Sequence, residues 1–415
     1  MGRLSPYLGV RNHWTRTPKA LRRKLDGLQR AWPKLNQDVS TPYHPLPTLP
    51  ADWLGALQGA VAAMAEYFSG IESTWGNSSE STPGSSPQSS SSGRSPSSLP
   101  PAPFDHLALH PSHADPVPAA LRGLYLEALH VVRIAELFDE HALCDLEFAD
   151  AQLHATRRLS CVNVRNVVPA PHLTARWAAA HSATLFSATL QPMAHTRGLL
   201  GLPEHSAWLV VDSPFSAEQL HVQVARHVST RYAHRSRSLP AVVDIMGSQF
   251  AAQPGNYLAF FSSHAYLQQV AAAFQAAHPE VPVWLQQRGM SESEQQGFLA
   301  AFTEHGQGIG FAVLGGSFGE GIDLPGRRLI GAFIATMGLP QINPINERLR
   351  QRLDELGHFG GGYQAVYLYP GMQKVVQAAG RVIRTTTDLG TLHLMDDRYA
   401  SEEVRGLLPG WWRIR

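Results

Sequence analysis

A regular alternation of apolar and amphipathic segments begins after Gly201 and continues almost to the end of the chain. Short apolar runs typical of buried strands alternate with segments of helical periodicity. This alternation predicts an α/β fold with a mostly parallel sheet covered by helices on both faces, because parallel strands need a crossover connection that a helix supplies. The predicted strands are 208–211, 257–261, 281–285, 309–314, 329–334, 365–369 and 389–395, and the predicted helices are 263–277, 291–303, 346–356 and 371–384.

Two of the predicted strands end in small polar or glycine-rich segments. Ser262 and Ser263 follow the strand at 257–261, and the loop 315–323, which contains two acids, follows the strand at 309–314. In open sheets of this kind, ligands bind beyond the carboxyl ends of the strands. We therefore expect a binding site at this edge of the sheet.

A third feature is the segment 377–384, Gln-Ala-Ala-Gly-Arg-Val-Ile-Arg. On a helix, Gln377, Arg381 and Arg384 would share one stripe, since they are four and then three residues apart. Arginine suits a phosphate site because its planar guanidinium donates two parallel hydrogen bonds and stays charged. A surface helix with two solvated arginines is an equally good interpretation of this segment taken alone.

The glycine-rich loop and the arginine segment together resemble the DinG/XPD group of superfamily-2 DNA helicases. Residues 316–323 match the form G-x-x-x-E-G-I-D of motif V, and residues 377–384 match the form Q-x-x-G-R-x-I-R of motif VI. The segment 187–190, Ser-Ala-Thr-Leu, follows a short β-prone run at 183–186 and resembles motif III, while Ser262 and Ser263 resemble motif IV. The motifs stand in family order, and the resemblance covers residues 183–415.

The resemblance implies an ATP-dependent DNA helicase with a RecA-like second domain, acting in DNA repair and moving 5′ to 3′ on single-stranded or forked DNA. Arg381 and Arg384 would reach the β- and γ-phosphates of ATP, and Gln377 would orient the attacking water or the γ-phosphate. Each serine or threonine taken alone could equally be a turn residue or a helix cap. The resemblance assigns ATP binding to Gly316, Glu320, Gly321 and Asp323, and DNA binding to Ser187, Thr189, Ser262 and Ser263.

The sequence departs from the family in its first half. Lysine occurs only at Lys19, Lys24, Lys34 and Lys374, and none of these follows a glycine, so no phosphate loop of the form G-x-x-x-x-G-K-[ST] is present. Residues 139–141, Asp-Glu-His, have the wrong spacing for the family's D-E-x-H box, and we expect them to continue a helix within 118–148. Mg²⁺ is implied with ATP, but its ligands are not expected in this chain.

The chain has two cysteines, Cys144 and Cys161, which are too few for the family's four-cysteine iron–sulfur cluster. We expect two ordinary buried thiols and no metal site. The formal net charge of +1 offers no bulk attraction for nucleic acid, so any DNA binding must come from a local groove. No stretch approaches 18 apolar residues and the start lacks an apolar signal region, which predicts a soluble, cytoplasmic protein without membrane contact.

We expect four regions. These are a helical arch-like segment at 1–71, a Ser/Pro/Gly-rich disordered linker at 72–104, return helices with a C-terminal remnant of the first helicase domain at 105–200, and the second RecA-like domain at 201–415. The remnant should include a strand at 159–168.

Two functions from different classes fit this sequence. The first is the C-terminal part of an ATP-dependent helicase, inactive as an isolated chain and completed by a companion chain that carries the first ATPase domain. The second is a non-catalytic truncated or split half that binds DNA or a partner chain without turning over ATP.

Overall fold

The computed structural model describes residues 2–4, 17–36, 39, 41–76, 119–148, 160–319, 322–357 and 360–415. The chain divides into two compact units, Met1–Val167 and Val168–Arg415, which we call the N-terminal and C-terminal units. Each unit has its own sheet and its own hydrophobic core.

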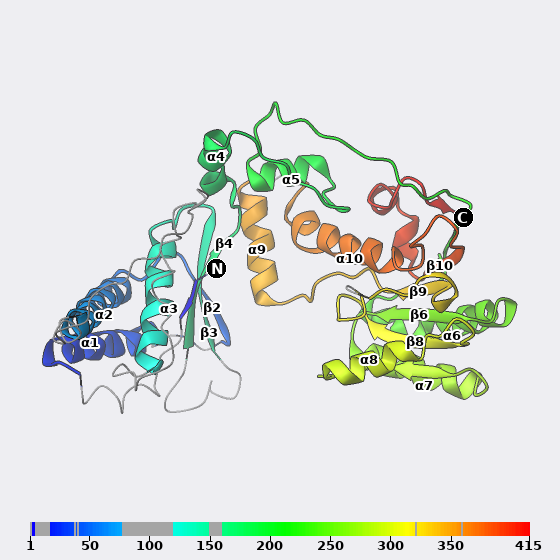
Figure 1. Cartoon of the computed structure of the whole chain (residues 1–415), viewed down its shortest axis with the longest axis horizontal. Helices are drawn as coiled ribbons and strands as arrows, with labels where there is room; N and C mark the ends of the chain where they lie inside the picture. The colour runs from blue at the N-terminus through cyan, green and yellow to red at the C-terminus, as the bar shows by residue number, and fades with distance from the viewer. Residues whose placement is uncertain are drawn as a thin grey trace, which may run out of the picture. The chain divides into compact units, whose positions relative to one another are not determined.

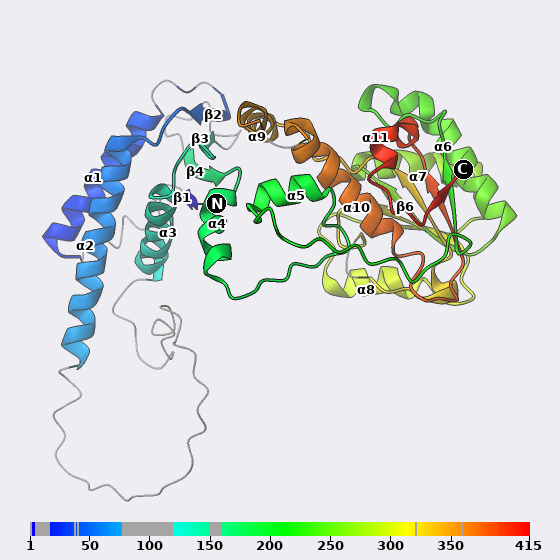
Figure 2. The ribbon, with the colours of Figure 1, turned by 90° about the horizontal axis from the view of Figure 1, so that it is seen from above.

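The N-terminal unit is built on a four-stranded antiparallel sheet in the order β1-β4-β3-β2. Helices α1 and α2 lie side by side (Figures 1 and 2), and the apolar faces of α1, α2 and α3 share one core with the sheet. The strands are β1 (Gly2–Leu4), β2 (Tyr43–Leu46), β3 (Ala142–Phe148) and β4 (Ser160–Asn166), and the helices are α1 (Lys19–Leu35), α2 (Ala51–Gly76) and α3 (Ala119–Ala135). The predicted strand at 159–168 corresponds to β4.

The helical prediction for 118–148 is wrong beyond Ala135, where α3 ends. Residues 139–141 form a turn rather than a helix end, because the Asp139 side chain accepts a hydrogen bond from the His141 N–H at 2.8 Å. The Asp139 carbonyl also accepts from the Ala142 N–H at 3.1 Å, which closes the turn. Strand β3 follows, with Asp145 and Glu147 two residues apart and therefore on the same face.

Both cysteines lie in this antiparallel sheet, Cys144 on β3 and Cys161 on β4, and both are buried. Burial raises the pKa of the Cys144 thiol to about 12, and the charge of the neighbouring Asp145 adds to the shift. A thiol with this pKa is a poor nucleophile at neutral pH, in agreement with the expectation of ordinary buried thiols.

The C-terminal unit is built on a seven-stranded sheet in the order β11-β5-β10-β9-β6-β8-β7, and every neighbouring pair is parallel. The α/β, RecA-like fold class is thereby confirmed. The strands are β5 (Leu220–Val224), β6 (Asn256–Phe261), β7 (Val283–Leu285), β8 (Gly308–Val313), β9 (Gly331–Ala335), β10 (Gly390–Leu394) and β11 (Arg413–Ile414).

Helices cover both faces of this sheet, as the sequence predicts. Helices α6 and α7 pack on one face, and α8 and α10 pack on the other (Figure 1). Strand β6 shows why the strands read as apolar runs, since all six of its residues are buried between the two helical layers. The helices of the unit are α4 (Ala170–Ala179), α5 (Met193–Leu200), α6 (Arg235–Ala252), α7 (His264–Ala277), α8 (Glu292–Ala300), α9 (Pro344–Glu355), α10 (Tyr369–Ala379) and α11 (Glu402–Arg405).

Two predicted strands of this unit are wrong. Residues 208–211 lie outside the sheet, where Leu209 and Val211 are 83% and 79% exposed, and β5 takes the place expected for them. Residues 365–369 belong to a π-helical turn, Gln364–Leu368, that leads into α10 and buries Tyr367 and Leu368. A short apolar run can be buried equally well by a strand or by a helix, so periodicity alone cannot separate them.

The β-prone run at 183–186 is not a strand either, and Phe186 is 90% exposed. Helix α2 continues to Gly76, and residues 77–118 lie outside the described residues, so most of the segment predicted as a linker at 72–104 lies outside them too. None of the described helices combines the length and the apolarity that crossing a bilayer requires.

Candidate nucleotide and nucleic-acid site

The loop after β8 is shaped by glycine and anchored by two apolar side chains. Gly315 has a φ of +79°, a backbone conformation that residues with a side chain rarely adopt. A Cβ atom at this position would also lie only 3.1 Å from Cδ of Lys374. Phe318 and Ile322 are buried, and the ring centroid of Phe318 lies 4.3 Å from that of Phe298 on α8. These contacts fix the loop at the carboxyl end of β8. Gly316 is half-buried within it.

Two site residues expected in this loop, Glu320 and Gly321, lie outside the described residues. Asp323 follows them and is exposed, with 74% of its side chain accessible.

Arg381 and Arg384 do not continue α10, so the prediction of a helix through residue 384 is wrong. The helix ends at Ala379 with Gly380 as its C-cap, and the Arg381 N–H bonds to the carbonyl three residues before it. Beyond the turn, the Asp388 carboxylate accepts the Arg384 N–H at 2.7 Å and so holds the backbone away from a helical path.

The two arginine side chains nevertheless converge on one atom of the glycine-rich loop. Nη1 of Arg381 and Nη2 of Arg384 each lie 2.9 Å from the carbonyl oxygen of Ile322. Nε of Arg384 lies 3.3 Å from Oδ1 of Asp323, an exposed pair that water screens strongly. Two cations held beside one neutral acceptor and one exposed carboxylate create a local positive potential that favours an anion.

Gln377, the third residue of the expected stripe, lies half-buried in the last turn of α10, directly before the turn that carries both arginines. Of the three residues, Arg381 and Arg384 contact this loop, and both lie outside the helix that the spacing predicted for them.

Ser262 and Ser263 lie at the carboxyl end of β6 and differ in their contacts. Ser262 is exposed, and its hydroxyl oxygen accepts a hydrogen bond from Nη2 of Arg235 at 2.8 Å. Ser263 is the N-cap of α7, since its hydroxyl oxygen accepts from the Tyr266 N–H at 3.3 Å.

Ser187 and Thr189 form a local turn in which the Thr189 N–H donates to the Ser187 hydroxyl oxygen at 3.2 Å. The same turn is tied to α10, because Nε2 of Gln373 donates to the Thr189 carbonyl at 3.1 Å. No motif or spacing in the sequence singles out Gln373, although it lies on the helix that precedes the two arginines.

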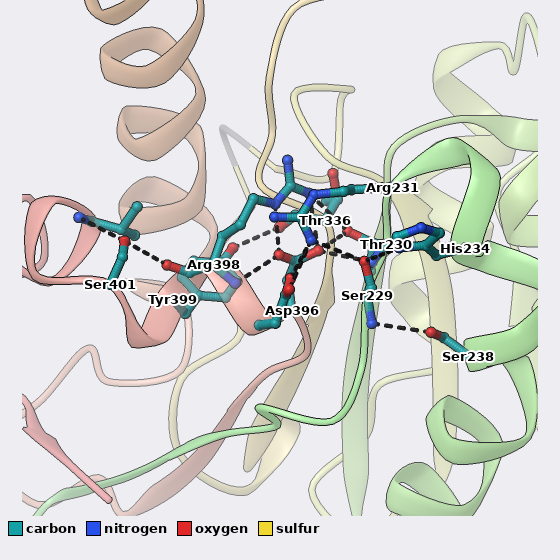
Figure 3. A network of polar contacts seen from close by, with 12 residues as sticks. Ser229, Thr230, Arg231, His234, Ser238, Thr336, Asp396, Arg398, Tyr399 and Ser401 are labelled. Carbon is teal, nitrogen blue, oxygen red and sulfur yellow. Dashed lines mark hydrogen bonds and ion pairs between the residues drawn. The ribbon is translucent and has the colours of Figure 1, made fainter.

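Sequence reasoning also missed a polar network at the carboxyl ends of β5 and β10 (Figure 3). The buried Asp396 carboxylate accepts hydrogen bonds from the Thr230 N–H at 2.8 Å, from the Thr230 hydroxyl, and from Nε of Arg398 at 2.7 Å. Burial alone would raise the pKa of Asp396, but its hydrogen bonds to Arg398 and Thr230 and the charge of Arg398 hold that pKa well below its usual range.

The network continues outward on both sides. Nη1 of Arg231 lies 2.7 Å from Oδ1 of Asp397 at the surface, and the Tyr399 hydroxyl donates to the Thr336 carbonyl at 2.6 Å in the interior (Figure 3). These contacts join the loop after β5 to the loop after β10, at the edge of the sheet where ligands are expected. The signal that could have revealed the network is the polar pattern of residues 396–398 directly after an apolar strand.

Comparison by sequence finds helicases. A family model described as a helicase C-terminal domain matches residues 246–415. The ATP-dependent DNA helicase chl-1 of Caenorhabditis elegans is 38% identical over 113 residues, which are 27% of this chain and 13% of that protein. The XPD subunit of the general transcription and DNA repair factor IIH of Arabidopsis thaliana is 26% identical over 197 residues, which are 44% of this chain and 26% of that protein. The chain thus spans only a minor part of these relatives.

Comparison of structures finds the same fold. The structure of S. tokodaii Xpd4 superimposes with a TM-score of 0.55 and 12% identity, covering 100% of this chain and 72% of that chain. An XPD helicase structure gives a TM-score of 0.51 and 16% identity, covering 100% of this chain and 65% of that one. The matching family domain and the sequence relatives support a C-terminal portion of a DinG/XPD-type superfamily-2 helicase, and residues 246–415 form its helicase C-terminal domain.

Proposed function

We propose that the chain works as part of an ATP-dependent DNA helicase, in which the C-terminal unit supplies one wall of the nucleotide site. The observation that carries this proposal is the convergence of the Arg381 and Arg384 guanidinium groups on the Ile322 carbonyl. Two positioned guanidinium groups suit the oxygens of a triphosphate, because each can donate parallel charge-assisted hydrogen bonds.

In this proposal Arg381 and Arg384 contact the β- and γ-phosphates of ATP and exchange the Ile322 carbonyl for phosphate oxygens. Gln377 orients the attacking water or the γ-phosphate. Gly316, Glu320, Gly321 and Asp323 line the nucleotide side of the loop.

Among the residues that the structure describes, no group of three or more His, Cys, Asp or Glu side chains is placed to bind a metal ion. When bound with ATP, Mg²⁺ would neutralise charge on the phosphates. We propose that a companion chain carrying the first ATPase domain supplies its protein ligands.

The same edge of the sheet is proposed to follow a DNA strand, with movement from 5′ to 3′. Ser262 is exposed there, and Ser187 and Thr189 lie in the turn tied to α10. Ser263 uses its oxygen as a helix cap but can still donate its hydroxyl hydrogen to a phosphate. The four-region organisation at 1–71, 72–104, 105–200 and 201–415, and a cytoplasmic site of action, belong to the same proposal.

A non-catalytic role is the second candidate, and one observation favours it. Arg381 and Arg384 are both engaged by protein groups, the Ile322 carbonyl and Asp323, so they could serve only to hold the loop in place. The chain would then bind DNA or a partner without turning over ATP.

Nucleotide binding separates the two candidates. We would titrate the full chain into a fluorescent ATP analogue with Mg²⁺ and compare the wild type with Arg381→Ala and Arg384→Ala. Losing a hydrogen bond to a charged group costs about 1.5–3 kcal/mol, so each variant should bind roughly ten times more weakly or worse. ATP hydrolysis by the isolated chain should stay at background, because arginine groups accelerate phosphoryl transfer only where the phosphates are already positioned.

Arg348→Ala is the matched control, since Arg348 is a surface arginine of α9 paired with Glu355 at 3.1 Å. It should leave nucleotide binding unchanged. If the wild type does not bind the analogue, or if the variants of Arg381 and Arg384 lose stability without losing affinity, the non-catalytic candidate replaces the first.

A further inference from the structure

A strongly basic segment runs past the carboxyl end of β5. Residues 219–243 contain four arginines, at positions 226, 231, 235 and 237, and neither Asp nor Glu. In a chain whose formal net charge is only +1, this is a local concentration of positive charge, although Asp397 pairs with one of the four arginines, Arg231. It is the kind of local feature that nucleic-acid binding by a nearly neutral protein requires.

An exposed aromatic ring lies within this segment. Tyr232 begins a short 3₁₀ turn before α6, and it is 88% exposed. A single exposed tyrosine is unremarkable on its own. The surroundings of this one are unusual, because the guanidinium of Arg235 lies 5.6 Å from the centre of its ring.

Arg235 is itself held rigidly by several contacts. Its Nε donates to the Thr230 carbonyl at 3.1 Å, its Nη2 donates to the Ser262 hydroxyl at 2.8 Å, and its guanidinium lies 4.8 Å from the centre of the Tyr266 ring. Thr230 is in turn fastened to the buried Asp396. The geometry therefore presents the ring, the guanidinium and the Ser262 hydroxyl as one preorganised group.

Donors remain available on this group. Among the residues that the structure describes, the hydrogen bonds of Arg235 come from Nε and Nη2, which leaves the two hydrogens of Nη1 for the ligand proposed below. The guanidinium of Arg235 can donate two hydrogen bonds to a phosphate, and the exposed ring of Tyr232 can stack on a base. Together the two groups suit one nucleotide.

We propose that Tyr232 stacks on one base of single-stranded DNA while Arg235 donates to the adjacent phosphate. This inference rests on the proposed DNA-binding function, and it adds a base contact to a site otherwise assigned only phosphate contacts. A single strand is required because a base within a duplex has no free face. The contact tolerates any sequence, since every base has a π face.

The test is a binding comparison on two oligonucleotides of equal length, one of thymidines and one of abasic residues, measured with the full chain by fluorescence anisotropy. Stacking on an aromatic side chain contributes roughly 1–3 kcal/mol, so Tyr232→Ala should weaken binding to the thymidine strand about 5- to 160-fold. Tyr232→Phe should bind nearly as the wild type does, because the ring is retained. On the abasic strand, Tyr232→Ala and the wild type should bind equally.

Arg235→Ala should behave differently and weaken binding to both strands. The slope of the logarithm of the binding constant against the logarithm of the salt concentration should fall by about the value of one phosphate contact. Leu389→Ala is the control for loss of an exposed side chain. Leu389 is 69% exposed and directly precedes β10, so it lies at the amino end of that strand, whereas Tyr232 follows the carboxyl end of β5. This control variant should change neither affinity.

The outcomes separate this inference from the function on which it rests. If the wild type binds thymidine strands but Tyr232→Ala binds them equally well, the base contact is wrong and DNA binding stands. An equal loss on both strands would also overturn stacking. If the wild type binds neither strand, the proposed DNA-binding function itself fails.

Discussion

Each of the two sheets of this protein has a buried aspartate paired with an arginine, but the pair lies at a different position in each sheet. In the antiparallel sheet of the N-terminal unit, the buried Asp145 on β3 pairs with Arg165 on β4, so the ion pair crosses between strands. In the parallel sheet of the C-terminal unit, the buried Asp396 pairs with Arg398 beyond the end of β10.

The difference follows from how each sheet is covered. Strands of the parallel sheet lie between two layers of helices, so ionic groups are confined to the strand ends, where they can organise a ligand site. The antiparallel sheet can keep charged residues on a strand face. The buried ion pair therefore marks a candidate site in the C-terminal unit and links two strands in the N-terminal unit.

Removing the two carboxylates should have the largest effect and should be unequal. Asp396→Ala leaves Arg398 without its main partner and is expected to destabilise the C-terminal unit by about 3–5 kcal/mol. Asp145→Ala should cost the N-terminal unit only about 1–3 kcal/mol, because Glu147 lies 3.5 Å from Nη2 of Arg165 and can replace the lost charge.

Hydrogen exchange followed by mass spectrometry would measure both losses, since peptides from each unit report on that unit separately. Each variant should leave exchange in the other unit unchanged. Equal losses in the two variants would show that Glu147 does not substitute and that the two ion pairs are equivalent.

Lowering the pH should have the next largest effect on the stability of the C-terminal unit. His393 on β10 is buried, its Nε2 lies 2.9 Å from Oε1 of Gln249, and burial, reinforced by the charge of His221, lowers its pKa to about 4. Because the folded-state pKa lies below the unfolded value of about 6.5, the neutral form contributes stability that is complete above roughly pH 6.5. This stability is lost as the pH falls towards 4, by up to about 3 kcal/mol.

Urea unfolding at pH 7 and at pH 4.5 would measure this loss in the wild type and in His393→Gln, which keeps a polar side chain that does not titrate. The variant should lose less stability between the two pH values. An identical loss in both proteins would show that His393 does not carry the pH dependence.

The smallest expected effect concerns helix caps, in which the two units also differ. Ser263 caps α7 of the C-terminal unit, whereas α1 of the N-terminal unit begins after Pro18 without a side-chain cap. Ser263→Ala should therefore cost about 1 kcal/mol and speed exchange in the first turn of α7. Ser263→Thr should retain most of the wild-type stability, because threonine also caps helices. If Ser263→Ala loses DNA affinity without losing stability, Ser263 binds the ligand instead of stabilising the helix.

The parallel sheet could be predicted from the sequence alone, and so could the meeting of Arg381 and Arg384 with the loop after β8. The runs at 257–261, 309–314 and 329–334 are apolar almost throughout, which is typical of strands that are buried on both faces. The structure places them in the buried strands β6, β8 and β9. The motif spacing likewise identified Arg381, Arg384 and the loop after β8, because their chemistry depends on residue type.

The positions of short apolar segments and of one helix end could not be predicted from local sequence patterns. Residues 208–211 have strand-like composition but no sheet position, and residues 365–369 are buried in a helical turn instead. The end of α10 was equally hidden, since it depends on the Asp388 carboxylate, which accepts backbone N–H groups beyond the helix. Intrinsic preferences are worth only about 1 kcal/mol or less per residue, so burial and hydrogen bonding outweigh them at residues 365–369 and at the end of α10.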